Sequence, residues 1–471
     1  MSIYLLKKSD ASSSFNIVSQ KYIQLAMIIA VMSFPTLVAA QSEPFPKAGE
    51  ILHVPVRQTL NFEQALQQVQ QYQSQNGVWQ AQQQIAEANI KQSRLWANPT
   101  VSVQQKGIQA NQELEFGISQ KLDVFGERRA AKQLAEVQSS QVGLNQALYQ
   151  AQLKLAVKFL WSQIEILQLQ HQVATAQLRT SQATLNATRL RYQAGSIAQL
   201  DLDRSLMTHI ENQRVYQETE LALSTAKKQL ANLWGESHGN FSVNTGSKSS
   251  WPDQSKAEIE KHLQQNLFEH AVQLHVLQQR SEINYLKAKR RPAPTVNLGM
   301  VRNKIAGSSA TENQVRLGIE IPLNIINRQQ YPLAISQTKL DLLDQQLKFY
   351  KQQNLNTIQT LQSELDGLQR QYQLLNDQQI PLSETVQEKM LLGFKVGKYA
   401  ITDVQQATLQ LQEQRLKKIQ LLKDAWRKAI EAESLALGIE PELIMSNKAF
   451  NQINQNLWQD TFNLSPISGA E

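Results

Sequence analysis

Two stretches of the chain alternate apolar and polar residues with a period of two, the pattern of a β-strand with one apolar face. The apolar positions are Leu114, Phe116, Ile118 and Leu122 in the first stretch, and Val315, Leu317, Ile319, Ile321 and Leu323 in the second. The alternate positions hold Glu113, Glu115, Ser119 and Lys121 in the first, and Arg316, Gly318 and Glu320 in the second. A shorter apolar pattern precedes each stretch, so two β-hairpins are predicted.

The four predicted strands cover about residues 99–108, 113–124, 294–305 and 314–325. About ten residues is the length that a tilted strand needs to cross a bilayer. Two ordinary half-buried hairpins on a soluble core are the alternative. The membrane interpretation is favoured because the polar faces carry charges and nothing else in the chain could form a sheet to pack against them. Pro322 lacks a donor, so we expect it near the end of its strand or at a bulge.

Very long helices follow the strands. Residues 127–193 contain no proline and place apolar residues at heptad spacing, at Leu134, Leu148 and Leu155 and again at Leu178, Leu185 and Tyr192. A helix of this length extends about 100 Å. A second long helix is predicted for 328–396, with Pro332 in its first turn and a kink at Pro381. Helices about half as long are predicted for 58–95 and 198–234.

The order of these elements indicates an internal duplication. "NPTVSV" at 98–103 matches "APTVNL" at 293–298, and "RYQAGSIAQLD" is followed 202 positions later by "GFKVGKYAITD". We therefore predict a mainly α fold with membrane β-hairpins, built from a duplicated helix-strand-strand-long helix-helix unit. The first repeat covers 58–235, an equatorial linker 236–255 and the second repeat 256–438, and an equatorial or disordered tail follows at 439–471.

Composition and the N-terminus place the chain in the cell envelope. The formal charge of +7 is dispersed, which argues against nucleic acid as a partner. The apolar run from Leu25 to Ala40 ends in small residues, so 1–40 is interpreted as a signal peptide and 41–57 as a periplasmic segment. The chain has no cysteine, so we expect neither disulfides nor a lipid anchor.

The sequence provides no pattern for catalysis or for a cofactor. His262, His270 and His275 form the densest histidine cluster, but their spacing does not place them on one helix face as metal ligands. The segment "GSSATENQ" at 307–314 lacks the lysine of a phosphate-binding loop. No Ser/His/Asp arrangement can be argued from spacing. We expect no catalytic residues, no cofactor and no metal site, and the chain is predicted not to be an enzyme.

With these repeats, the "VFGERR" exit from strand to helix and the two glycine turns, the sequence resembles the TolC-like outer-membrane efflux channels over about residues 57–438. The "LDVFGERRAAK" segment is similar to the heavy-metal branch. The resemblance implies a homotrimer in which a twelve-stranded barrel in the outer membrane of a Gram-negative bacterium continues as a periplasmic α-helical barrel. It also implies a periplasmic adaptor protein and an inner-membrane efflux pump of the RND type as partners.

The resemblance assigns the two glycine turns to the periplasmic tip. Gly195 and Gly397 would permit the left-handed backbone of a tight reversal between helices. Together with Tyr192, Ala198 and Ala400 they would close the helical cylinder and bind the adaptor.

Residues beside these turns would form the gate. The family carries two acidic residues three apart at the constriction, and here Asp403 and Gln406 stand at those positions. A Tyr and an Arg of the family bond to an Asp and hold the tip shut; Asp201 is retained, but Phe394 and Tyr399 stand in place of the other two. A hydrogen bond from Tyr399 to Asp201 is the expected surviving latch. Helix N-capping is the alternative role of Asp201 and Asp403, and both roles can hold at once.

The leading functional hypothesis is a passive exit channel of a tripartite efflux system that exports metal cations or drugs. The competing hypothesis is a periplasmic coiled-coil adaptor or tether, which would share the signal and the long helices but would lack lipid-facing strands. Trp96 and Phe125 lie at the helix-proximal ends of strands. They are interpreted either as part of a membrane-interface belt or as ordinary packing under the sheet.

Overall fold

The computed structural model describes residues 58–107, 112–243, 251–252, 255–304, 310–446 and 448–462. The predicted signal peptide and the segment 41–57 lie outside the described residues, as does the end of the tail. All descriptions below concern the unit that begins at Arg57.

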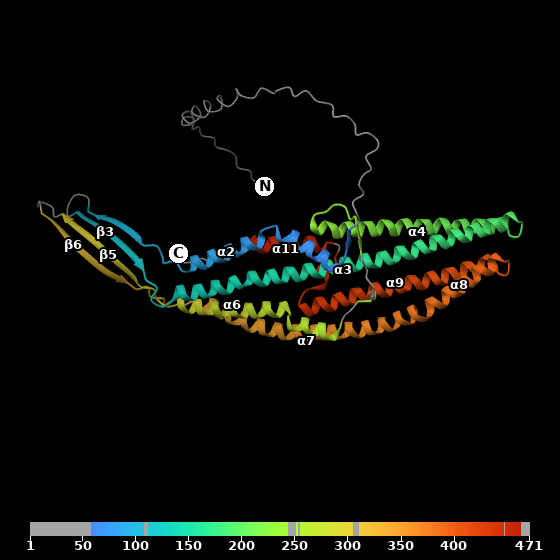
Figure 1. Ribbon diagram of the computed structural model, residues 1–471. Coiled ribbons are helices and arrows are strands. Elements are labelled where there is room, and N and C mark those ends of the chain that lie inside the picture. Colours follow the sequence, from blue (N-terminus) through green and yellow to red (C-terminus); the bar gives the residue numbers. More distant parts are fainter. Residues whose placement is uncertain are drawn as a thin grey trace, which may run out of the picture. The chain divides into compact units, whose positions relative to one another are not determined.

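A four-stranded antiparallel sheet forms one end of this unit (Figure 1). Its strands are β2 (Thr100–Lys106), β3 (Gln112–Lys121), β5 (Thr295–Lys304) and β6 (Thr311–Glu320), in the order β2-β3-β5-β6. These strands overlap the four predicted ranges, although β3 and β6 end a few residues earlier than expected. Strand β6 ends before Pro322, which therefore does not interrupt the ladder.

The two faces of the sheet differ in polarity. In the pairing register, Phe116 lies opposite Met300 and Ile118 lies opposite Leu298, so the apolar residues of neighbouring strands gather on one face. These side chains are exposed in the single chain, up to 77% for Val315 on β6. An exposed apolar sheet face of this kind marks a site of contact with another protein or with a membrane.

The opposite face carries a charge network that crosses three strands. Nη1 of Arg316 on β6 lies 2.9 and 3.0 Å from the two carboxylate oxygens of Glu115 on β3. The guanidinium reaches over β5 at Gly299, where a Cβ atom would contact both partners. Glu113 lies 3.8 Å from Arg316 and 3.9 Å from Lys106 of β2. These four charges therefore neutralise one another within the polar face.

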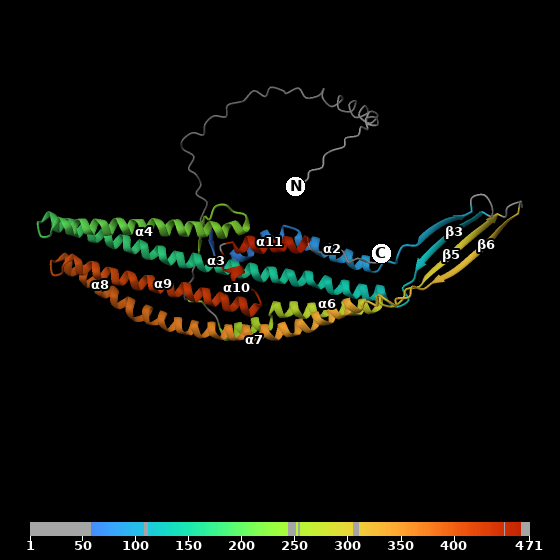
Figure 2. The ribbon, with the colours of Figure 1, turned by 180° about the vertical axis from the view of Figure 1, so that it is seen from behind.

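Two long helical hairpins extend from the sheet (Figure 2). The first consists of α3 (Glu127–Gln193) and α4 (Gln199–Ala231), and the second of α7 (Gln330–Leu374), a π-helical turn (Leu375–Gln379), α8 (Ile380–Lys395) and α9 (Ile401–Leu437). The 67 residues of α3 match the predicted helix. The kink expected at Pro381 takes the form of the π-helical turn just before it, because proline cannot donate the regular hydrogen bond.

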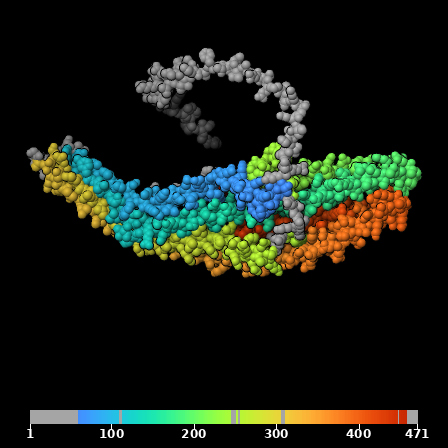
Figure 3. Space-filling model, viewed as in Figure 1, coloured from blue at the N-terminus to red at the C-terminus, as the bar shows by residue number. Residues whose placement is uncertain are grey.

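Shorter helices lie beside the sheet-proximal half of the long ones. They are α1 (Phe62–Ser74), α2 (Val78–Ser93), α5 (Lys256–Gln264) and α6 (Leu267–Lys289). The single helix predicted for 58–95 is wrong: Gly77 adopts φ +68° and separates α1 from α2. In Figure 3, the first repeat (blue to green) covers one long side of the described part, and the second repeat (yellow to red) covers the other.

The main hydrophobic core lies halfway along the helices. Strand β1 (Gln58–Leu60) pairs in parallel with β4 (Phe241–Val243), and the 3₁₀ turn Asn232–Trp234 packs nearby. The tail supplies α10 (Pro441–Ile444) and α11 (Ala449–Phe462) to the same core. An equatorial position is one of the two alternatives predicted for the tail, and these helices pack at that level. The core is filled by residues that include Leu153, Leu155, Ile164, Leu230, Ile430, Ile444 and Ile453.

Candidate functional site

The α3–α4 and α8–α9 turns lie together at the end of the unit far from the sheet (Figures 1 and 2). In the first turn, Gly195 has φ +69° and its N–H donates to the carbonyl of Tyr192 at 2.9 Å. The N–H of Ser196 donates to the carbonyl of Arg191 at 3.0 Å. This is a Schellman-type helix end, in which glycine takes the left-handed position without steric cost.

The second turn repeats this geometry. Gly397 has φ +83° and donates to Phe394 at 3.0 Å, and Lys398 donates to Gly393 at 2.8 Å. The residues Ala198 and Ala400, which precede α4 and α9, have nearly the same backbone angles, with ψ of 156° and 159°. The duplicated sequence therefore produces a duplicated turn, as the spacing of the glycines predicts.

Asp403 caps the helix that leaves the second turn. Its Oδ2 accepts a hydrogen bond of 3.0 Å from the N–H of Ala400. Asp201 also lies in the first turn of its helix, where a carboxylate interacts favourably with the helix dipole. Asp403 and Gln406 are both exposed and lie one helical turn apart. The capping role is thus confirmed for Asp403, and its role at a constriction stays a prediction.

The buried side chain of Phe394 lies between the two turns. Its side chain is 0% exposed and packs with Ile401 and Val404. Nη1 of Arg191 donates to the Phe394 carbonyl at 3.1 Å, and the guanidinium lies 4.7 Å from the ring centre. Arg191 therefore joins the end of α3 to the end of α8. Sequence reasoning missed this pair, although Arg191 directly precedes the residue aligned with Phe394.

Tyr399 does not make the expected latch in this chain. Its ring lies against Gly393, only 2.2 Å from where a Cβ atom would be, and the Lys398 ammonium lies 5.8 Å from the ring centre. Among the described residues no hydrogen bond joins Tyr399 to Asp201. The absence of a side chain at Gly393 allows the ring to pack on the backbone instead. A gating role for these residues stays a prediction.

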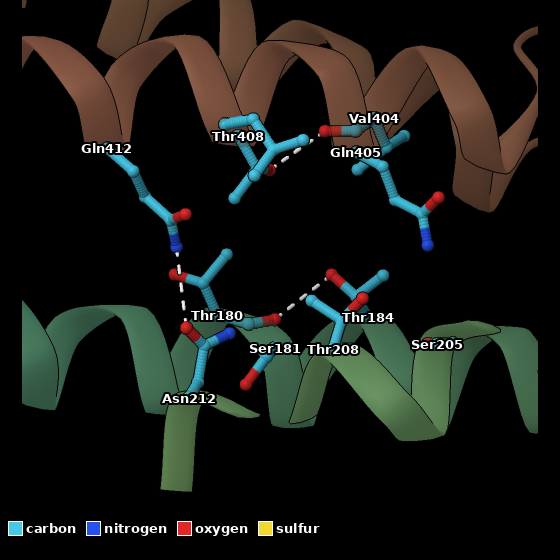
Figure 4. A pocket seen from close by; sticks show the side chains of 11 residues that line it. Thr180, Ser181, Thr184, Ser205, Thr208, Asn212, Val404, Gln405, Thr408 and Gln412 are labelled. Atoms are coloured by element: carbon cyan, nitrogen blue, oxygen red, sulfur yellow. Dashed lines mark hydrogen bonds between the residues drawn. The ribbon is translucent and has the colours of Figure 1, made fainter. Parts of the chain in front are cut away.

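A polar cavity of about 110 Å³ lies behind the tip, between the α3–α4 hairpin and α9 (Figure 4). It is lined by Thr180, Ser181, Thr184, Ser205, Thr208, Asn212, Val404, Gln405, Thr408, Leu409 and Gln412. Thr184 and Thr408 donate to carbonyls of their own helices, at 3.0 and 2.8 Å. One long hydrogen bond, 3.5 Å from Gln412 to Asn212, crosses the cavity.

The hydroxyl of Ser205 is buried in this cavity and has no hydrogen-bond partner among the described residues. The helices α3, α4 and α9 thus meet here through small polar side chains that bond mainly within their own helices. One hydrogen bond between lining side chains, from Gln412 to Asn212, crosses the cavity between the two hairpins. The only sequence signal was the Ser/Thr-rich run from Thr180 to Thr188, which sequence reasoning did not use.

A charged cluster surrounds the π-helical turn. Nζ of Lys418 on α9 donates to Oδ1 of Asn376 at 2.6 Å and lies 5.6 Å from the Tyr372 ring centre. Burial lowers the pKa of the Lys418 ammonium, and nearby Glu384 opposes this shift. Nη2 of Arg415 lies 2.6 Å from Oε1 of Glu384. These contacts fix α9 against the irregular part of the α7–α8 helix.

The structure gives no grouping suited to a resident metal in the part of the chain that it describes. No three His, Cys, Asp or Glu side chains gather there in a ligand arrangement. His262 lies half-buried near Glu433, whereas His270 is exposed on another helix. None of the described helices has the length and apolar character to cross a bilayer.

Comparison with known proteins identifies the fold. No family model matches the chain. The cobalt-zinc-cadmium resistance protein CzcC of Cupriavidus metallidurans is 21% identical over 353 residues, which are 73% of this chain and 82% of that protein. The chain is thus similar to a metal-resistance protein over most of both lengths.

Solved structures of outer-membrane proteins have a similar fold. The outer membrane protein VceC of Vibrio cholerae superposes with a TM-score of 0.60 at 14% identity, covering 80% of this chain and 96% of VceC. CusC, described for its folding and transmembrane channel formation, gives 0.58 at 17% identity, covering 80% of this chain and 89% of CusC. The predicted resemblance to TolC-like outer-membrane channels is confirmed at the level of the fold. The prediction that the chain is not an enzyme agrees with these channel relatives.

Proposed function

We propose that this chain, which has the fold of the TolC-like outer-membrane channels, is the outer-membrane component of an efflux system. The observation that carries the proposal is the sheet β2-β3-β5-β6, which has one exposed apolar face, one charged face and long helices attached at one end. An apolar sheet face that packs against nothing in the described chain suits lipid, and a charged face suits a water-filled lumen.

The sheet supports assembly into a closed barrel. Strands β2 and β6 each pair on one side only within the described chain, and unpaired backbone groups in hydrocarbon cost several kcal/mol each. Neighbouring strands alternate in direction, so β6 of one copy and β2 of the next run antiparallel. Copies can therefore join edge to edge, and three copies form a barrel of twelve strands that the α3 and α7 helices continue into the periplasm.

The tip turns are the proposed contact with a periplasmic adaptor, which links the channel to an inner-membrane pump of the RND type. Both turns present exposed side chains, Tyr192 in the first and Val396 in the second. The channel itself is passive. Metal cations are the proposed cargo because a relative is named for cobalt, zinc and cadmium resistance. Drugs are the alternative cargo.

Fractionation tests the location and the assembly. We expect the protein in detergent extracts of the outer membrane as a heat-modifiable trimer. Release into the periplasm as a soluble protein would instead favour the adaptor or tether hypothesis. A deletion strain then tests the cargo: we expect greater sensitivity to zinc, cadmium and cobalt than the parent, whereas a change confined to drugs would favour the alternative cargo.

Cysteine cross-linking tests the barrel directly, because the chain has no natural cysteine. A cysteine replacing Val103 on β2 is combined in turn with one replacing Val315, Leu317 or Ile319 on β6. All four positions lie on the apolar face, so we expect one combination to form disulfide-linked trimers. The matched control combines Val103→Cys with Arg316→Cys, whose side chain lies on the charged face. Cross-linking of the control alone would contradict the proposed arrangement.

A further inference from the structure

The connections between strands and helices bring unpaired arginines and exposed apolar side chains to one level. Four segments meet there: 94–99, 121–129, 289–294 and 321–331, called the junction belt below. Hydrogen bonds hold them side by side, including Leu122 N to Pro294 O at 2.8 Å and Nδ2 of Asn324 to the Arg290 carbonyl at 2.9 Å. Nε of Arg128 donates to the Arg94 carbonyl at 3.1 Å.

The apolar members of the belt are highly exposed. They are Leu95, Trp96, Val124, Phe125, Leu323, Ile325, Ile326 and Tyr331, and Ile326 reaches 90% exposure. Aromatic and aliphatic side chains at the end of a lipid-facing sheet are typical of the boundary between hydrocarbon and headgroups. The apolar surface therefore continues past the strands into the belt.

Five arginines of the belt have no carboxylate partner among the described residues. They are Arg128, Arg129, Arg290, Arg291 and Arg328, and among the described residues no carboxylate lies at ion-pair distance from any of the five. The nearby acids are already engaged. Both carboxylate oxygens of Asp123 accept from main-chain N–H groups of α3, at 2.7 and 3.0 Å, and Glu127 faces Lys121 at 4.0 Å.

Two of these guanidiniums lie over exposed aromatic rings. Arg128 is 4.2 Å from the Trp96 ring centre, and Arg291 is 5.7 Å from that of Phe125. An arginine on an aromatic face keeps its remaining N–H groups available to an oxygen acceptor. In a sheet that spans the outer membrane as proposed above, these rings would lie at the hydrocarbon boundary and the guanidiniums at the depth of the lipid phosphates.

We propose that the junction belt binds anionic phospholipid headgroups of the periplasmic leaflet. The inference rests on the proposed function, because it requires the sheet to span the outer membrane. Planar guanidiniums match the two free oxygens of a phosphodiester, and basic residues near an anionic membrane surface are attracted to it. The apolar residues of the belt would contact the first carbons of the acyl chains, as amphipathic boundary groups do.

Native mass spectrometry of the purified full-length trimer tests the proposal. The probes are phosphatidylglycerol and zwitterionic phosphatidylcholine with the same acyl chains. The test variant is Arg290→Gln with Arg291→Gln; Asn324 bonds to the main chain of Arg290, so that contact is kept. The matched control is Arg189→Gln with Arg204→Gln, two exposed arginines near the tip that change the net charge equally.

We expect the wild type to retain phosphatidylglycerol over phosphatidylcholine, with retention that falls as salt rises. The test variant should lose affinity by about fivefold for each guanidinium removed, whereas the control should match the wild type. Equal retention of both lipids by the wild type would overturn the proposal, and so would unchanged or equally reduced binding in both variants. If the test variant fails to trimerise, the salt dependence of the wild type decides alone.

The two proposals fail in different ways. A protein that never enters the outer membrane contradicts the proposed function. A membrane-inserted trimer that shows no preference for the anionic lipid contradicts only the headgroup site.

Discussion

The guanidinium of Arg191 lies 4.7 Å from the centre of the Phe394 ring, and its Nη1 donates a hydrogen bond of 3.1 Å to the carbonyl of the same residue. Arg191 lies in the last turn of α3 in the first repeat, and Phe394 lies in the last turn of α8 in the second. One side chain therefore connects the two tip turns.

Replacing Arg191 with glutamine should loosen the tip. The loss of a cation–π contact and a charged hydrogen bond is worth about 1–2 kcal/mol. We expect amide hydrogen exchange near both turns to speed up about tenfold, and single-channel conductance to rise. Arg189→Gln, at an exposed neighbouring position, is the control. Unchanged exchange in the Arg191 variant would show that the pair does not hold the turns.

Alanine at Gly397 should destabilise the second turn by about 1–2 kcal/mol, because the left-handed backbone crowds a Cβ atom. Gly393→Ala should also destabilise, since its Cβ would lie 2.2 Å from the Tyr399 ring. Gly367→Ala is the matched control: this glycine lies inside α7 with open space around it, and alanine there should stabilise by about 0.5–1 kcal/mol. Hydrogen exchange and adaptor pull-down would measure these effects.

Two substitutions at Asp403 should separate its capping role from a role in ion passage. Asp403→Ala removes the bond to the Ala400 N–H and should cost about 1 kcal/mol, seen as faster exchange in the first turn of α9. Asp403→Asn keeps an acceptor and should retain most of that stability. If the carboxylates form a ring in the trimer, both variants should lower cation preference, measured as a reversal potential in a salt gradient. An unchanged potential would leave capping as the sole role.

Ser205→Ala should leave stability unchanged or raise it by about 1 kcal/mol. The Ser205 hydroxyl is buried and has no hydrogen-bond partner in the described part of the chain, so its removal relieves a desolvation cost. Chemical unfolding of the detergent-solubilised trimer would measure the change. Thr184→Ala, which removes a hydroxyl that is bonded within its helix, is the comparison. A clear loss of stability in Ser205→Ala would mean that solvent fills the cavity and bonds this hydroxyl.

His262 should make the equatorial region sensitive to acid. Burial lowers its pKa below the ordinary value of 6.5, Lys154 and Lys158 lower it further, and Glu433 and Glu258 oppose them. The unfolded chain then binds more protons than the folded chain just below pH 6.5, so the free energy of unfolding falls as the pH drops through that window.

His262→Gln tests this pH dependence. The variant should flatten the fall in stability between neutral and mildly acidic pH, measured as the unfolding midpoint at several pH values. His270→Gln, an exposed histidine in the following helix, should keep the wild-type profile. If both variants follow the wild type, another group is responsible for the acid sensitivity.

The long helices and the strands of the four-stranded sheet could be predicted because their patterns of apolar and polar residues continue over many residues. The α3 helix has no proline over its whole length, and each strand alternates polarity over enough residues to define its faces. The parallel pair β1–β4 was missed because each strand has only three residues and its partner lies far away in the chain. Gly77 was overlooked as a helix break because an isolated glycine is tolerated in many helices.

The details of the tip could be predicted only in part. Both glycines were identified from the repeat, because a left-handed turn favours one residue type. The contact between the Tyr399 ring and Gly393 was not predicted. It forms only because glycine has no side chain, so the ring can pack on the backbone across the turn. The arginines of the junction belt gave no periodic signal. They come together only when three segments distant in sequence converge.

The π-helical turn at Leu375–Gln379 inserts one extra residue into the ladder of the α7–α8 helix. One residue corresponds to about 100° of rotation around the helix axis. The stripe of side chains that α7 presents is therefore out of phase with the stripe presented by α8. The continuous α7–α8 helix can thus contact one set of neighbours along its sheet-proximal half and a different set near the tip.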